Sequence, residues 1–148
     1  MTGGLQRGQR FGATPLPGCG RAAIMAYLRA SGDDNPVHHD LATARQAGFD
    51  DVLVPGLMIQ GQMAGILARW LPGARIETLD AQFVLPVTAG SLLSMAGRVA
   101  ALRADGAAIL RLMAMKGAQV AVLGEATVSP GLVQTDHPAR GSGFSNSR

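Results

Sequence analysis

The segment from residue 55 to residue 71 most constrains the fold, because it predicts a long helix that carries little charge. Pro55 suits a first helical turn, and Pro72-Gly73 ends the helix. Apart from Arg69, the other faces of the helix carry almost no charge, so we expect the helix to be buried nearly all round. Apolar residues at i, i+4, i+7, i+8 and i+11 form one continuous face: Ile59, Met63, Ile66, Leu67 and Trp70.

Most of the chain after this helix predicts β-structure. Apolar and polar residues alternate over residues 78–85, 93–101, 109–115 and 120–128, and a short strand is allowed near residues 14–16. The last three of these segments are joined by short links, which favours antiparallel pairing of consecutive strands. An apolar helix and long antiparallel strands combine economically when the sheet curls around the helix. The predicted fold class is therefore α+β, a single hotdog domain with a long central helix wrapped by a curved antiparallel sheet.

The length and composition of the chain limit the kinds of protein it can be. The chain has 148 residues, 47% hydrophobic and 16% charged, which is typical of one globular domain. Its single cysteine, Cys19, excludes an internal disulfide and fits a reducing cytosol, so we expect a cytoplasmic protein with an inert thiol. No secretory signal or transmembrane run is recognisable. We expect the domain to occupy residues 1–130 and a flexible tail residues 131–148, where Gly, Ser, Pro and Asn accumulate.

The charge pattern argues against nucleic-acid binding. The net charge is +3, the arginines are scattered, and aromatic residues make up only 4% of the chain. A modest positive field suits a phosphorylated small molecule, although a weak solubility bias explains it equally well.

Residues 31–40 hold most of the chemically able side chains. A helix predicted over residues 21–30 ends at Gly32, and Asp40 is the expected N-cap of a short helix over residues 41–47. Between them, Asp33 and His38 lie five residues apart across an Asn-Pro pair, close enough to share a water molecule in general acid–base catalysis. Taken alone, the segment fits equally well an Asx-turn with a surface histidine.

Three other side chains receive no catalytic role. Asp34 is expected to be solvated, His39 to point away from His38, and His137 to lie in the tail. A metal site is rejected, because adjacent histidines rarely point at one ion and no further His/Cys cluster completes a shell.

The whole segment resembles the MaoC-like dehydratase / R-specific enoyl-CoA hydratase family of hotdog proteins. The resemblance rests on Tyr27-x-x-x-Ser31-Gly32-Asp33-x-Asn35-Pro36-x-His38-x-Asp40, with about seven residue types at fixed offsets. It extends over roughly residues 20–130, and the further matches are Ala44, Gly48, Phe49, Pro55-Gly56-Leu57, Lys116-Gly117-Ala118-Gln119 and Gly124-Glu125-Ala126.

The resemblance implies a hydro-lyase that adds water reversibly to the 2,3-double bond of an enoyl thioester, with no cofactor and no metal. Asp33 and His38 would be the catalytic pair. Asn35 would hold the turn or touch the bound water, and the amide of Gly56 would be the oxyanion donor. The implied substrate-binding residues are Asn35, Gly56, Leu57 and Tyr27.

One junction departs from the family pattern. The family usually has His-Gly-Met where this chain has Pro55-Gly56-Leu57, which leaves the Gly56 amide in place but changes the surroundings of the substrate. The implied partners are an acyl-CoA or acyl-carrier-protein thioester and further copies of this chain. A homodimer or higher homo-oligomer with a continuous sheet is expected, because a lone unit leaves a sheet edge exposed.

Two alternative functions stay open. One is an acyl-CoA thioesterase, because the same fold hosts that activity. The other is a non-catalytic partner subunit of a heteromeric hydratase. The presence of both Asp33 and His38 argues against the second alternative, whereas Pro55 argues mildly for it.

Overall fold

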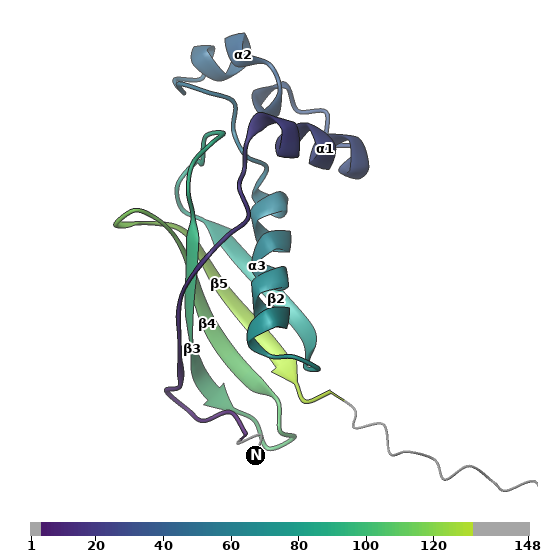
Figure 1. Ribbon diagram of the computed structural model, residues 1–148, viewed down its shortest axis with the longest axis vertical. Helices are drawn as coiled ribbons and strands as arrows, with labels where there is room; N and C mark the ends of the chain where they lie inside the picture. The colour runs from purple at the N-terminus through teal and green to yellow at the C-terminus, as the bar shows by residue number, and fades with distance from the viewer. Residues whose placement is uncertain (1–3, 132–148) are drawn as a thin grey trace, which may run out of the picture.

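A curved five-stranded antiparallel sheet with a long helix on its inner face forms the body of the structure (Figure 1). The computed structural model describes residues 4–131, so the tail expected over residues 131–148 lies almost wholly outside the described residues. The elements are β1 (Arg10–Pro15), α1 (Arg21–Ser31), a 3-10 turn (Pro36–His38), α2 (Leu41–Gln46), α3 (Gly56–Trp70), β2 (Arg75–Phe83), β3 (Ser94–Leu102), β4 (Ala108–Lys116) and β5 (Gln119–Ser129). The predicted α+β hotdog architecture is confirmed.

The sheet has the strand order β1-β3-β4-β5-β2. The predicted meander of the last three strands is confirmed, with β4 paired to β3 on one side and to β5 on the other. The two edge strands come from earlier in the chain: β1 pairs with β3, and β2 pairs with β5. None of the described helices is long and apolar enough to cross a membrane.

The long helix begins one residue later than predicted. Pro55 is its N-cap, with a non-helical ψ of 132°, and its carbonyl accepts hydrogen bonds from the N–H groups of Met58 and Ile59 at 3.1 and 3.3 Å. Gly56 is therefore the first residue of α3.

The core lies between α3 and the inner face of the sheet. Met63, Ile66 and Leu67 of α3 are almost fully buried. They belong to one cluster with equally buried residues from the strands, among them Met95, Val99, Leu110, Leu112 and Val122. Burying each such side chain stabilises the fold by about 1.5–3 kcal/mol.

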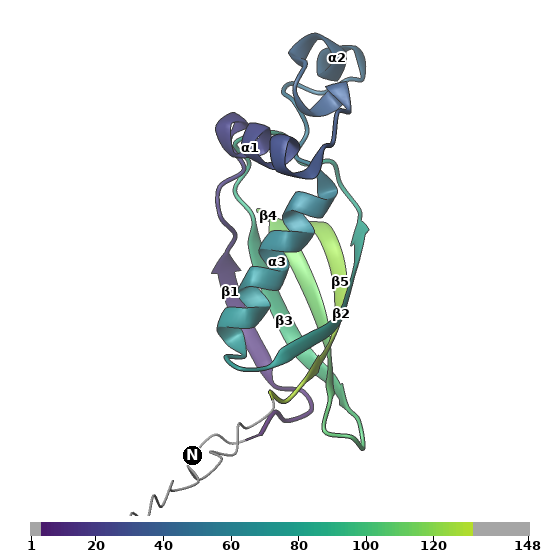
Figure 2. The same cartoon turned by 90° about the vertical axis from the view of Figure 1, so that its right-hand side faces the viewer.

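The expectation that α3 is buried nearly all round is wrong for the described chain. Leu57 is 66% exposed, and Gly61, Gly65 and Ala68 on the same side of the helix are also exposed. The reason is geometric, because the strands curve around only one side of the helix (Figure 2). The low charge of this side therefore does not reflect burial within one chain.

The C-terminal end of α3 packs tightly against the β1 edge of the sheet. The Trp70 ring stacks on Phe11 with 4.9 Å between ring centroids, and its Nε1 donates a hydrogen bond to Thr14 Oγ1 at 3.0 Å. Gly97 leaves room for this contact, since a Cβ atom there would lie 2.8 Å from Leu112 Cδ2 and 3.1 Å from Trp70 Cζ3.

We expect Gly97→Ala to destabilise the protein by about 1–3 kcal/mol, because the added methyl group overpacks a filled core. Urea unfolding followed by circular dichroism measures this change. Gly12→Ala is the matched control, since a Cβ atom on Gly12 meets nothing within 4 Å. Equal unfolding midpoints for the two variants would contradict the packing argument.

Candidate active site

Residues 31–40, here called the polar segment, join α1 to α2 at the same end of the molecule as the N-terminus of α3 (Figure 2). The chain leaves α1 at Gly32, which adopts the left-handed conformation with φ of 74° and donates its N–H to the carbonyl of Leu28. This conformation favours glycine, and it directs the chain away from the helix into the polar segment. The predicted C-cap is confirmed.

Asp33 and His38 lie close together, as the sequence predicts. Asp33 Oδ2 is 3.7 Å from His38 Nε2. This separation is too long for a direct hydrogen bond, but it allows both groups to contact one water or hydroxyl between them. The other carboxylate oxygen of Asp33 accepts the N–H of Asn35 at 3.1 Å, which fixes the carboxylate relative to the turn.

A backbone contact orients the imidazole of His38. Its Nδ1 lies 2.8 Å from the carbonyl oxygen of Leu53. Because a carbonyl oxygen only accepts, Nδ1 carries the proton, and in the neutral ring Nε2 keeps a lone pair on the side of Asp33. The imidazole is 13% exposed and the Asp33 side chain 34%, so the pair is partly screened but still reachable from outside.

The turn is fastened to the segment that leads into α3. Asn35 Oδ1 accepts the N–H of Val37 at 3.2 Å and so caps the 3-10 turn, which is the first of the two roles predicted for this residue. The N–H of Leu53 donates to the carbonyl of Val37 at 3.0 Å. Leu53 therefore holds the turn through its N–H and His38 through its carbonyl, three residues before Gly56.

Gly56 opens α3, where the first N–H groups lack intrahelical acceptors and the helix dipole is positive. Its lack of a side chain is expected to let a substrate approach, but an aromatic ring occupies this space. A Cβ atom on Gly56 would lie 2.9 Å from ring carbons of Phe83, which is 45% exposed at the end of β2. Sequence reasoning gave Phe83 no role at the site. The sequence does contain a signal for its position. Phe83 follows Leu79 and Ala81 at every second residue, which places all three on the side of the strand that faces the helix.

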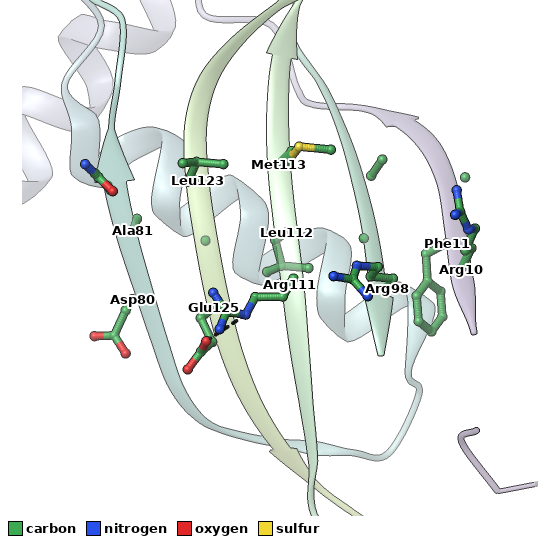
Figure 3. Close-up of a pocket in the computed structure, with 15 residues that line it drawn as sticks. Arg10, Phe11, Asp80, Ala81, Arg98, Arg111, Leu112, Met113, Leu123 and Glu125 are labelled. Atoms are coloured by element: carbon green, nitrogen blue, oxygen red, sulfur yellow. Dashed lines mark ion pairs between the residues drawn. The ribbon is translucent and has the colours of Figure 1, made fainter. Parts of the chain in front are cut away.

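The other two predicted substrate-binding residues, Leu57 and Tyr27, line neither of the two pockets described for residues 4–131. Leu57 projects from the open side of α3, and Tyr27 of α1 is half-buried against the core. A trough with a volume of about 830 Å³ lies on the outer face of the sheet (Figure 3), and none of the predicted site residues lines it.

His39 and Cys19, which were predicted to have no catalytic role, make the following contacts. His39 Nε2 lies 3.3 Å from the carbonyl oxygen of Asp34, and it makes no described contact with His38. Cys19 is buried, and burial raises the pKa of its thiol, which contacts Gln62 Oε1 at 3.5 Å. Within residues 4–131, no three His, Cys, Asp or Glu side chains converge in a way that could hold a metal ion. His137 lies outside the described residues.

Asp40 is the N-cap of α2, as predicted. Its Oδ1 accepts the N–H of Ala42 at 3.1 Å, and its Oδ2 accepts the hydroxyl of Thr43 at 2.6 Å. These two hydrogen bonds hold the pKa of the Asp40 carboxyl below its usual range, and the one from Thr43 has the larger effect. The cap therefore ties one end of α2 to the segment that carries His38.

A lowered pKa in the folded state means that ionised Asp40 favours folding above its unfolded pKa of about 3.9. This contribution is lost as the pH falls through the folded pKa. We expect the stability of the wild type relative to Asp40→Asn, which can still cap, to decrease on acidification from neutral pH to below pH 4. Urea midpoints over this range measure the difference, and a difference independent of pH would contradict the assignment.

Three comparisons with known proteins each find a match to this chain. Residues 6–120 match the family model described as "MaoC like domain". The (R)-specific enoyl-CoA hydratase of Aeromonas caviae is 34% identical over 113 residues, which cover 74% of this chain and 84% of that protein. A solved structure of an (R)-hydratase from A. caviae involved in PHA biosynthesis superimposes with a TM-score of 0.77 and 32% identity, covering 85% of this chain and 97% of that one.

A further match is to a mitochondrial 3-hydroxyacyl-[acyl-carrier-protein] dehydratase from Solanum lycopersicum. It is 37% identical over 67 residues, 45% of this chain. The matched part spans only 41% of that relative's length.

Proposed function

The chain belongs to the MaoC-like domain family, and on this premise we propose that it is an R-specific hydro-lyase acting on the 2,3-double bond of an enoyl thioester. The observation that carries the proposal is the Asp33–His38 pair, with 3.7 Å between Oδ2 and Nε2 and the proton of the imidazole directed to Leu53. A water held in this gap lies within reach of two groups that can take its proton or orient it, and general acid–base catalysis needs at least one such group.

In the proposed reaction Asp33 and His38 hold one water between them. One of the two takes a proton from the water as its oxygen bonds to C3 of the enoyl group. The same pair then delivers a proton to C2, so the overall change is the addition of one water. The reverse sequence removes water from a 3-hydroxyacyl thioester.

The proposal assigns the developing negative charge to the N-terminus of α3. As C3 is attacked, the thioester oxygen becomes enolate-like, and the amide of Gly56 is the proposed donor to it. Donors of this kind contribute about 10²–10³-fold to the rate in other enzymes. Phe83 lies directly beside Gly56 and must share the space with any thioester that reaches this amide.

The substrate carrier is part of the proposal. A CoA thioester is favoured over an acyl-carrier-protein thioester, because the relative named as an enoyl-CoA hydratase matches over 84% of its length and the carrier-protein dehydratase over 41%. We include a homodimer or higher homo-oligomer with a continuous sheet, since β1 and β2 are both edge strands. We also include a cytoplasmic location, because a chain with a single cysteine suits a reducing compartment.

We expect Asp33→Asn and His38→Ala each to lower the rate of crotonyl-CoA hydration by about 10²–10⁴-fold, because each removes one member of the acid–base pair. The loss of enoyl absorbance measures this rate. Asp34→Asn is the matched control, since Asp34 is exposed and adjacent in sequence, and it should keep wild-type activity. Undiminished activity in both pair variants would remove the catalytic assignment.

The same assay separates the alternatives. The proposal predicts formation of a 3-hydroxyacyl thioester with no release of free thiol. Free CoA thiol without a change at the 2,3-bond would identify a thioesterase instead. An inert protein that gains hydratase activity only when a related chain is added would identify a partner subunit.

A further inference from the structure

We propose that the outer face of the sheet is an interface with a second copy of this chain. The proposal starts from a row of charged residues, here called the charged row, that crosses all five strands (Figure 3). The registers pair its members one by one in the order Arg10, Arg98, Arg111, Glu125 and Asp80.

The charged row lies on the face opposite α3. Along β4, Leu110, Leu112 and Ala114 are buried against the core, whereas Arg111 and Met113 between them are exposed. Because strand side chains alternate, Arg111 points outward, and its cross-strand partners Arg98 and Glu125 point the same way.

The charges of this row are separated by sign. The arginines come from β1, β3 and β4, and the two carboxylates from β5 and β2. Arg111 Nε is 3.0 Å from Glu125 Oε2, so these two charges compensate each other within one chain. Within residues 4–131, neither Arg10, Arg98 nor Asp80 forms an ion pair. The row is therefore positive at one end and negative at the other.

A second row of outward residues supplies apolar area next to the charges. Met113 pairs with Leu123, and each side chain is 42% exposed. Ala96 of β3 and Gln82 of β2 extend this row on either side. Both rows line the trough of about 830 Å³ on this face.

A second copy fits this pattern in one orientation. Rotation by 180° about an axis parallel to the strands reverses the cross-strand order. If the axis passes between β4 and β5, Arg98 faces Asp80 of the second copy, Arg111 faces its Glu125, and Met113 faces its Leu123. An axis across the strands keeps the order and brings like charges together. Aligned packing of two sheets, about 10 Å apart, is a common arrangement in proteins.

The separation of signs favours a second copy over other occupants. An acidic partner would be repelled by Asp80 and Glu125, and a basic partner by Arg10 and Arg98. A second copy in the orientation above instead places Arg98 opposite Asp80 at both ends of the contact. The contact uses a face and leaves both sheet edges free, so it can join two edge-paired dimers. It does not depend on the proposed chemistry.

The test reverses one charge at each end of the row. We expect Arg98→Asp alone and Asp80→Arg alone each to halve the wild-type mass in sedimentation velocity at low salt, because each places like charges opposite each other. An equimolar mixture of the two variants should recover the wild-type mass, since opposite charges then face each other across the two chains. High salt should weaken the wild-type assembly.

Arg7→Asp is the matched control for Arg98→Asp, because Arg7 is exposed in the turn before β1 and its substitution makes the same change of net charge. It should keep the wild-type mass. The proposal is overturned if neither reversal lowers the mass, or if the reversals lower it and the mixture does not restore it. Far-ultraviolet circular dichroism of each variant establishes that a lower mass does not come from unfolding.

Discussion

The contact between α3 and the inner face of the sheet determines where the rest of the molecule lies. The buried side of the helix, with Met63, Ile66 and Leu67, is held against the strands. The helix axis then runs along the sheet, and its N-terminus lies at one end of it (Figure 2). The connection through Leu53 reaches the helix at this end, and the same residue holds the turn that carries His38. The candidate site is therefore positioned by the core, although none of its polar side chains belongs to the core.

Local signals predicted most of the fold. The helical spacing that ends at Trp70 identified α3, and the period-two alternation identified β3, β4 and β5, because each pattern reflects which side of one element is buried. Gly32 and Asp40 were predictable for a similar reason, since caps act within a few residues. The pairing of β2 with β5 and of β1 with β3 was not predicted, because it depends on how distant segments meet.

The parts of the site that sequence reasoning missed involve groups that leave little trace in a sequence. The carbonyl and N–H of Leu53 hold the turn, and any residue other than proline supplies both groups. Phe83 meets Gly56 only because β2 runs beside α3 in space. The open side of α3 was misjudged for a different reason. Residues such as Gly61 and Ala68 are uncharged, but a lack of charge does not by itself indicate burial by the same chain.

The register that builds the core also builds the charged row. A slip of one residue in β4 would turn Arg111 inward and Leu112 outward, and it would break both surfaces at once. The buried neighbours of Arg98 and Glu125, Val99 and Ala126, hold these charges in line on the outer face. The inner face fixes α3 and, through Leu53, the candidate site. Reversing an outward charge thus changes the association surface and leaves the packing that positions Asp33 and His38 intact. The proposed association and the proposed catalysis can therefore be tested separately in this fold, because successive residues of each strand serve opposite faces.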